Sequence, residues 1–426
     1  MATTPDAQDY PLSEVPQNAR RSLRSLSVVL LGFTFFTATM FGGGQIGAAF
    51  PVWPDLIAVI LVGNLLLGAY VAVLGLIGCR TGLNTALLSR FGFGRMGARL
   101  SDTVLGLTQI GWYGWGAATM GVVLIRLFGG DPDASPMLLN VLILVFGLAF
   151  CWTAYIGYRG LEILSMVAVP LMVLLLVVSL GISISDAGGF SGMGAIEPTA
   201  TLGIGTAITV VFGTFVSGGT QATNWTRFAR TPGQAVGASL MAFFLGNGLM
   251  ILMGAFGALV YGQPDVVEVL VIQGLSVLGI VMLFLNLWTT QDNTIYNFSA
   301  VGCTALNTRR RRMVTLVGAV IGTALALMRI DLYLIPLLVL LGTFVPPIGG
   351  VIMADFFYKH RGRYPKLAIE TLPAVNVAGL SGYGIGCLVA FTSPGIPPLN
   401  GIIAAIVTYV LADMALVRRD GSTVVR

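Results

Sequence analysis

The chain has 426 residues, of which 56% are hydrophobic and only 10% are charged, and its mean hydropathy is +0.88. This composition excludes a water-soluble protein of that size and predicts a polytopic α-helical membrane protein. The apolar runs are about 20 residues long and do not alternate with polar residues, which excludes an outer-membrane barrel. The formal net charge of +5 does not indicate a nucleic-acid partner, because the basic residues fall in loops, where membrane topology explains them.

The cysteine and histidine contents argue against an enzyme or a transition-metal site. The four cysteines, Cys79, Cys151, Cys303 and Cys387, are far apart, with neither metal-ligand spacing nor an evident disulfide framework. The single histidine, His360, lies in a basic loop, which removes most histidine-based catalysis. The sequence also lacks an HExxH motif, a GxSxG nucleophile elbow and a phosphate-binding loop. We therefore expect neither an enzyme nor a bound organic cofactor.

About twelve apolar segments are long enough to cross a lipid bilayer. In chain order they cover residues 26–49, 54–78, 97–127, 136–155, 160–183, 200–229, 232–261, 267–302, 313–328, 331–357, 370–393 and 396–417. Every second connection is rich in Lys and Arg, as are both chain ends, whereas the connections between them carry mainly Asp and Glu. By the positive-inside rule, this alternation predicts a multi-pass protein of the cytoplasmic (inner) membrane with both termini in the cytoplasm.

The first and sixth segments are both interrupted by glycine and threonine. Residues 32–39 read Gly-Phe-Thr-Phe-Phe-Thr-Ala-Thr, and residues 213–220 read Gly-Thr-Phe-Val-Ser-Gly-Gly-Thr. Paired interruptions of this kind in corresponding halves of a chain favour a transporter site built from broken helices, although small residues also serve close helix packing. The tenth segment is interrupted at Pro346-Pro347, which predicts a kink that is either a gate hinge or simply a bend.

The eighth segment carries polar residues deep inside a long apolar run. On a helix, Asn286, Thr289, Thr290 and Asn293 fall at positions i, i+3, i+4 and i+7 and share one face. Uncharged oxygen ligands of this kind suit a small hard cation, and the alternative is that they hydrogen-bond to a neighbouring helix. Unpaired polar groups are costly in lipid, so in either case this face must look into the protein or into a wet cavity.

The third segment places Gln109 and Trp112 one turn apart on one helix face. An amide beside an indole plane is what recognition of a flat heteroaromatic ring requires, with stacking for affinity and hydrogen bonds for identity. On the sixth segment, Phe215 is a candidate second aromatic plate, and Ser217 and the backbone near Gly218 are candidate hydrogen-bonding groups. Single aromatic residues of this kind are more often core than ligand platform, but the two interrupted segments favour a ligand site.

Several motifs follow one another in the same order as in a known transporter family. They are Pro16-Gln17-Asn18-Ala19-Arg20, the stretch from Gly32 to Met40, Gly63-Asn64-Leu65-Leu66-Leu67-Gly68, Thr108-Gln109-Ile110-Gly111-Trp112, Ala242-Phe243-Phe244-Leu245-Gly246-Asn247, Trp288-Thr289-Thr290 and Pro346-Pro347-Ile348-Gly349-Gly350-Val351. With these motifs the sequence resembles the nucleobase–cation symporter-1 family over nearly its whole length, and within that family the bacterial cytosine permeases.

The resemblance implies a leucine-transporter-type (LeuT) fold of two five-helix inverted repeats plus two further helices. The repeats would cover residues 26–183 and 200–357, the last two helices would cover 370–417, and the tails 1–25 and 418–426 would be cytoplasmic. The resemblance also implies sodium-coupled import of cytosine by alternating access around a site at the middle of the membrane.

The family's site residues are carried over to this sequence as follows. A sodium ion would be held by the backbone carbonyls of Gly32, Phe35 and Asn286 and the hydroxyls of Thr289 and Thr290. The base would lie between Trp112 and Phe215, with Gln109, Ser217 and the backbone of Gly218 at its edge and Phe36 nearby. Gln291 stands where cytosine permeases are expected to have Asn, which leaves the identity of the base open.

A second hypothesis is proton-coupled uptake of another heteroaromatic compound, such as a purine, a hydantoin or a hydroxymethylpyrimidine. Gln291 and Asp292 motivate it, since Asp292 is the one acidic residue deep inside a span. This carboxylate is either satisfied by neighbouring hydroxyl and N–H groups or serves as a proton carrier. A third hypothesis, a membrane receptor without transport, is opposed by the lack of a sizeable soluble domain.

Overall fold

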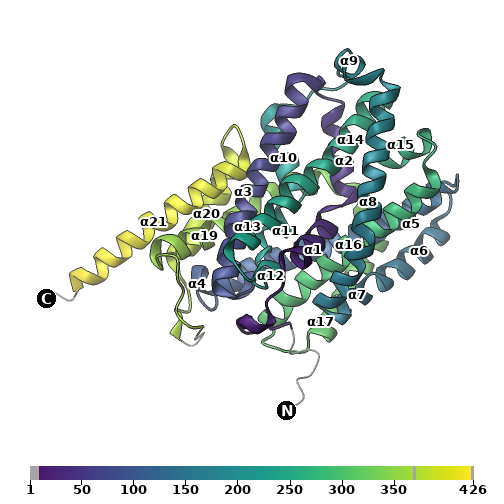
Figure 1. Cartoon of the computed structure of the whole chain (residues 1–426). Helices are drawn as coiled ribbons and strands as arrows, with labels where there is room; N and C mark the ends of the chain where they lie inside the picture. The colour runs from purple at the N-terminus through teal and green to yellow at the C-terminus, as the bar shows by residue number, and fades with distance from the viewer. Residues whose placement is uncertain (1–8, 368–370, 424–426) are drawn as a thin grey trace.

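The described part of the chain is built from helices arranged around two interrupted spans (Figure 1). The structure is a computed structural model that describes residues 9–367 and 371–423, and within these ranges it contains no β-strand. In chain order the α-helices are α1 (Leu23–Thr34), α2 (Thr37–Gly47), α3 (Ile57–Thr81), α4 (Thr85–Phe93), α5 (Ala98–Leu127), α6 (Pro136–Ala149), α7 (Cys151–Ile156), α8 (Tyr158–Asp186), α9 (Gly189–Gly194), α10 (Ile204–Gly213), α11 (Val216–Thr220), α12 (Thr223–Thr226), α13 (Pro232–Leu240), α14 (Asn247–Tyr261), α15 (Val266–Ile272), α16 (Ser276–Ala305), α17 (Arg311–Leu327), α18 (Leu334–Phe344), α19 (Pro346–Ala354), α20 (Val377–Thr392) and α21 (Pro397–Thr423).

Six helical runs in the described residues are long and apolar enough to cross a membrane, and the bent pair α1–α2 adds a seventh. The other predicted spans correspond to helices that are shorter, interrupted or more polar. The total of twelve crossings therefore stays a prediction, as does the division of residues 26–183 and 200–357 into two inverted repeats. The all-helical architecture itself is confirmed.

The predicted interruptions of the first and sixth spans are both present. Between α1 and α2, Phe35 and Phe36 leave the helical conformation and the axis bends by 57°. Between α10 and α11, Phe215 has φ −131° and ψ 13°, which ends the first helix. A break inside an apolar bundle frees backbone N–H and C=O groups, and these must find partners within the protein. At the first break the partners come from α16, as described below.

The structure corrects two predicted spans and locates the break in the tenth. The eighth span, expected as one helix over 267–302, is divided into α15 and α16, because Gly274 takes a positive φ of 71° between them. The eleventh helix is expected from residue 370, which lies outside the described residues; among those described, 371–376 precede the helix and it begins at Val377. In the tenth span, α18 and α19 are separated by Val345, and Pro346 and Pro347 occupy the first turn of α19. Prolines are tolerated there because N–H groups in the first turn of a helix have no acceptor within that helix, so their absence removes no hydrogen bond.

Most of the helices pack into two groups. In the first group, here called the bundle, α1, α2, α3 and α10 to α14 pack against one another. In the second, here called the scaffold, α5, α6, α7, α16 and α17 do the same, while α8 contacts both groups. Within the bundle the α2 and α14 backbones touch, since a Cβ on Gly43 would collide with the Ile251 carbonyl. Two compact groups that meet along a seam are the arrangement that rocking transporters use.

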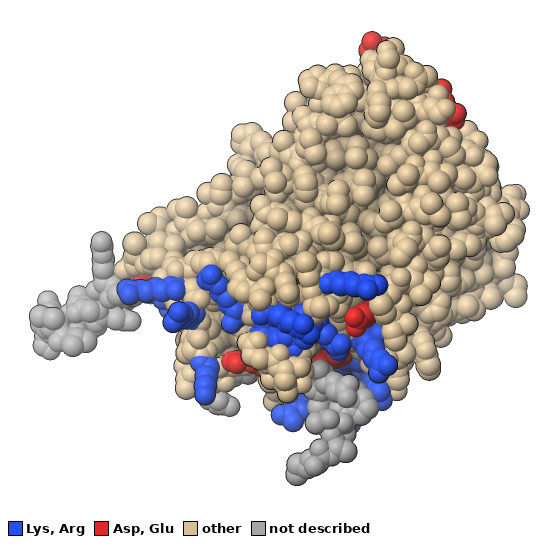
Figure 2. Space-filling model, in the orientation of Figure 1, with Lys and Arg blue, Asp and Glu red and all other residues tan. Residues whose placement is uncertain are grey.

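Positive charge gathers at one end of the molecule. Figure 2 shows Lys and Arg in a band at the end where the N-terminal segment lies, with a few Asp and Glu among them, whereas on this face the only charged residues at the far end are Asp and Glu. We call the first the basic end. Here Asp9 pairs with Arg311 of α17 at 3.1 Å, and Arg227, just after α12, donates to the carbonyls of Asp9 and Tyr10. The N-terminal segment thus lies across the seam and contacts both groups of helices.

Candidate substrate and ion site

A small cavity lies at the level of both helix breaks, between the bundle and the scaffold. Its lining residues are Phe33, Phe36, Gln109, Trp112, Thr214, Phe215, Ser217, Gly218, Thr290 and Thr294. All the residues expected at the substrate therefore face one cavity, although they come from α5 and from the two interrupted spans. Phe33, Thr214 and Thr294 were missed by the sequence reasoning. Thr294 had a usable signal, because it lies one turn beyond Thr290 on the same helix face.

The polar side chains of this cavity are only partly satisfied. The Trp112 Nε1–H donates to the Ser217 hydroxyl at 3.1 Å, which joins the scaffold to the bundle. Gln109 is 1% exposed, yet neither its amide nitrogen nor its amide oxygen has a hydrogen-bond partner among the described residues. A buried amide without partners costs about 1–3 kcal/mol, so such a group in a native protein calls for an explanation. The Gln109 amide offers one donor and one acceptor group at the cavity, and these can hydrogen-bond to the polar edge of a heterocyclic ring.

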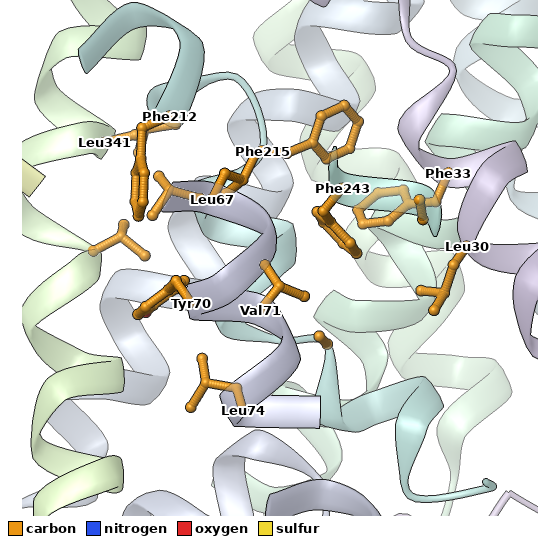
Figure 3. Close-up of a cluster of buried hydrophobic side chains, with 14 of the residues drawn as sticks. Leu30, Phe33, Leu67, Tyr70, Val71, Leu74, Phe212, Phe215, Phe243 and Leu341 are labelled. Atoms are coloured by element: carbon orange, nitrogen blue, oxygen red, sulfur yellow. The ribbon is translucent and has the colours of Figure 1, made fainter. Parts of the chain in front are cut away.

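Aromatic side chains supply four of the ten lining residues of this cavity, Phe33, Phe36, Trp112 and Phe215. Phe36 meets Trp112 edge to face at 5.4 Å between ring centroids and meets Phe215 in the same manner at 5.9 Å. On the bundle side, the rings of Phe33, Phe215 and Phe243 gather against α3 (Figure 3), with Phe33 and Phe215 5.1 Å apart. The cavity has a volume of about 10 Å³, room for no more than one water molecule. A planar ring can enter only if the Trp112 and Phe215 walls separate.

A wider cavity of about 250 Å³ lies next to this one, away from the basic end. The Trp115 ring lines it and also packs edge-on against Phe36 at 5.3 Å, so one indole borders both spaces. On the basic side the seam is closed by two buried hydrogen bonds between α12 and α16. Trp225 Nε1 donates to Asn293 Oδ1 at 2.9 Å, and Asn224 Nδ2 donates to Asn297 Oδ1 at 2.7 Å. The small cavity is therefore nearer to open space on the side away from the basic end.

The polar face predicted on the eighth span meets the break in the first span. The Thr290 hydroxyl lies 3.2 Å from the Phe33 carbonyl and 3.3 Å from the Phe35 carbonyl. The Asn286 side-chain oxygen accepts from both the N–H and the hydroxyl of Thr37, each at 2.8 Å. These groups satisfy the backbone freed at the break, and the face is 0–1% exposed, so it does not contact lipid.

The five residues expected at the ion come together at this contact. The Thr289 hydroxyl donates to its own helix, to the carbonyls of Leu285 and Asn286 at 3.0 and 3.1 Å. Gly32 packs beside Thr289, because the point where a Cβ on Gly32 would lie is 3.5 Å from the Thr289 Cβ. The donor set consists of carbonyl and hydroxyl oxygens without formal charge. Such a set fits a small hard cation of low charge and does not fit a soft transition metal.

Gln291 and Asp292 do not line the cavity. The Asp292 carboxylate accepts from the Thr153 hydroxyl at 2.7 Å and from the Asn293 amide at 3.0 Å. These contacts are the hydroxyl and N–H partners that a structural carboxylate requires. The Gln291 amide packs against Gly116 of α5, where any Cβ would collide with it, and it has no hydrogen-bond partner among the described residues.

The fold and this site define a membrane transporter with broken helices rather than an enzyme. A sequence profile for the family described as permease for cytosine/purines, uracil, thiamine, allantoin matches residues 14–371. The chain belongs to this family of permeases. It is 36% identical to the cytosine permease of Escherichia coli strain K12 over 415 residues, which are 97% of this chain and 96% of that protein.

More distant relatives agree with this assignment. The hydantoin permease of Microbacterium maritypicum is 24% identical over 447 residues, covering 94% of this chain and 88% of that protein. Among solved structures, Mhp1, a nucleobase-cation-symport-1 family transporter in a closed conformation with bromovinylhydantoin bound, has a TM-score of 0.84 at 18% identity. That match covers 96% of this chain and 95% of Mhp1, and it confirms the leucine-transporter-type fold.

Proposed function

We propose that this protein is a sodium-coupled symporter that imports cytosine across the cytoplasmic membrane by alternating access. The observation that carries the proposal is the position of Thr290. Its side chain lines the small cavity, and its hydroxyl contacts the carbonyls of Phe33 and Phe35 at the helix break. Thr290 thus belongs to both the proposed base site and the proposed ion site. Binding of the ion can therefore change the shape of the base site directly.

In this proposal, sodium draws the carbonyls of Gly32, Phe35 and Asn286 toward the hydroxyls of Thr289 and Thr290. The ion replaces hydroxyl hydrogens as the partner of these oxygens and fixes α1 and α2 relative to α16. Because Phe33 and Phe36 flank that break, fixing it also fixes one wall of the cavity. Sodium therefore favours the shape that binds the base, and by linkage the base favours sodium to the same extent.

The base would insert between Trp112 and Phe215, with the Gln109 amide and the Ser217 hydroxyl at its edge. Stacking of a base on an aromatic side chain contributes about 1–3 kcal/mol. The Gln109 amide, which has no partner among the described residues, adds hydrogen bonds to the base. With the basic end in the cytoplasm, the cavity closed on that side and the wider cavity on the other support entry from outside.

Uptake into proteoliposomes tests this function directly. Radiolabelled cytosine should accumulate only under an inward sodium gradient, and accumulation that does not depend on sodium would refute the coupling. Thr290→Ala should abolish the sodium dependence. Thr315→Ala is the matched control, because the buried Thr315 hydroxyl bonds only to the Arg311 carbonyl of its own helix.

Proton-coupled uptake of another heteroaromatic compound is the second candidate. It is favoured by the buried carboxyl of Asp292, which lies beside Asn293, a residue whose amide donates to the Thr289 carbonyl at 2.7 Å. Under this alternative, a pH gradient without sodium drives uptake, and Asp292→Asn abolishes it. Competition by purines, hydantoins and hydroxymethylpyrimidines against labelled cytosine identifies the ring that the site prefers.

A further inference from the structure

Ser165 of α8 carries a buried hydroxyl whose role the site described so far does not explain. The residue is 0% exposed, and its Oγ has no hydrogen-bond partner among the described residues. Several buried threonine hydroxyls instead bond to a carbonyl of their own helix, as Thr294 and Thr315 do. An unpaired hydroxyl in an apolar interior is destabilising unless a ligand completes it.

The Ser165 hydroxyl lies against Gly32, one of the five residues of the proposed ion site. The position that a Cβ on Gly32 would occupy is 2.5 Å from Ser165 Oγ and 3.5 Å from the Thr289 Cβ. Ser165 and Thr289 thus both lie within contact distance of the Cβ position of Gly32. Glycine is required here because a side chain would displace the serine hydroxyl. Three helices, α1, α8 and α16, therefore pack together at this point.

We propose that Ser165 supplies a further oxygen ligand to the sodium ion, from a helix outside the set that the family resemblance assigns. This inference rests on the proposed function, since it concerns the same ion. The chemistry agrees, because a serine hydroxyl is an uncharged hard donor like those of Thr289 and Thr290. It also gives a partner to a buried hydroxyl that has none among the described residues.

The assignment gives α8 a part in coupling. This helix packs against α1 and α14 of the bundle and against α16 of the scaffold. An ion that Ser165, α1 and α16 all coordinate fixes α1, α8 and α16 relative to one another. When the ion dissociates, the three helices can move apart. Sodium occupancy then sets the position of α8 as well as the shape of the base cavity.

The matched control is Ser239 of α13. It is also 0% exposed, its Oγ is also unpaired among the described residues, and it also abuts a glycine, with the Cβ position of Gly75 2.7 Å from its Oγ. It lies inside the bundle, between α13 and α3. If unpaired serines merely fill space beside glycines, Ser165→Ala and Ser239→Ala should behave alike.

The test is a sodium titration of thermal stability in the purified full chain, with choline chloride holding ionic strength constant. In the unaltered protein and Ser239→Ala, the melting temperature should rise with sodium at the same midpoint. In Ser165→Ala the midpoint should move to about tenfold higher sodium, the equivalent of about 1.4 kcal/mol. Cytosine affinity at saturating sodium should be unchanged, because Ser165 does not line the base cavity.

The outcomes separate the two proposals. A sodium response in the unaltered protein that persists with the same midpoint in Ser165→Ala overturns the role of Ser165 and leaves the proposed function intact. No sodium response in the unaltered protein overturns the sodium coupling itself, and the Ser165 ligand with it. If Ser165→Ala does not survive purification, the sodium dependence of cytosine uptake in membrane vesicles measures the same midpoint, with Ser239→Ala alongside.

Discussion

The two amide hydrogen bonds that close the seam on the basic side give a sharp test of how this protein opens. Asn293 and Asn297 lie one turn apart on α16 and accept from Trp225 and Asn224 of α12. All four side chains are 0–1% exposed. Because α12 belongs to the bundle and α16 to the scaffold, opening toward the basic end must break both bonds. We therefore expect Asn297→Ala to favour the state that is open at this end.

The size of the effect follows from the contacts. Asn297→Ala removes the 2.7 Å bond and leaves the Asn224 amide nitrogen unpaired in the closed state. In the open state the same nitrogen is exposed to water and can hydrogen-bond to it, so the substitution does not destabilise the open state by a comparable amount. An unpaired buried group of this kind costs about 1–3 kcal/mol, which shifts the equilibrium about 5- to 150-fold toward the open state.

Hydrogen–deuterium exchange measures that shift. Amides of α12 and of the half of α16 nearer the basic end should exchange faster in Asn297→Ala by the same factor, since protection reports the open population. Asn64→Ala is the control. It breaks a similar buried bond, Asn247 Nδ2 to Asn64 Oδ1 at 2.9 Å, but between two helices of the bundle. The reasoning fails if Asn297→Ala exchanges like the unaltered protein, or if Asn64→Ala accelerates α12 equally.

Three further predictions concern the base, a packing contact and pH. Trp112→Ala should weaken cytosine binding about 5- to 150-fold by isothermal titration, because stacking contributes about 1–3 kcal/mol; unchanged affinity would exclude stacking on Trp112. Gly116→Ala should lower the melting temperature and uptake because its Cβ collides with the Gln291 amide, and Gln291→Asn, one methylene shorter, should restore both. Burial lowers the pKa of His360, but hydrogen bonds to Asp355 and its charge outweigh burial and raise this pKa above its ordinary value of 6.5. The stabilisation is therefore complete below pH 6.5 and disappears as pH rises through the raised pKa, so His360→Gln should lower the melting temperature at pH 5.5 more than at pH 9.

The sequence was informative where a pattern is local. The Gly/Thr runs predicted both helix breaks. Helical periodicity placed Gln109 beside Trp112, and Asn286 beside Thr289 and Thr290, because residues three or four apart share a face whatever surrounds them. Periodicity could not bring α5, α16 and the first break to one cavity, since that depends on how helices pack. The family resemblance made that connection.

The features that were missed have weak sequence signals. Gly274 lies within a stretch that is otherwise apolar, so the division of α15 from α16 was not anticipated. Phe33 reads as one more apolar residue, and Ser165 reads as one more small residue in a span. Only the structure shows that Phe33 lines the cavity and that the Ser165 hydroxyl faces Gly32 without a partner.

A single side chain, Asn293, connects the proposed ion site to the closure at the basic end. Its amide nitrogen donates to the Thr289 carbonyl at 2.7 Å and to Asp292 at 3.0 Å, and its oxygen accepts from Trp225. The Trp225 ring in turn packs against Phe33, beside the first helix break, at 4.8 Å. Opening at the basic end moves α1 and α12, which both belong to the bundle, away from α16. Trp225 then leaves Asn293, and the carbonyls of Phe33 and Phe35 leave the Thr290 hydroxyl, so the Thr289 segment and the break lose support at the same time. Two arrangements of this short network, one closed and one open, would then be enough to link release of the ion to opening of the seam.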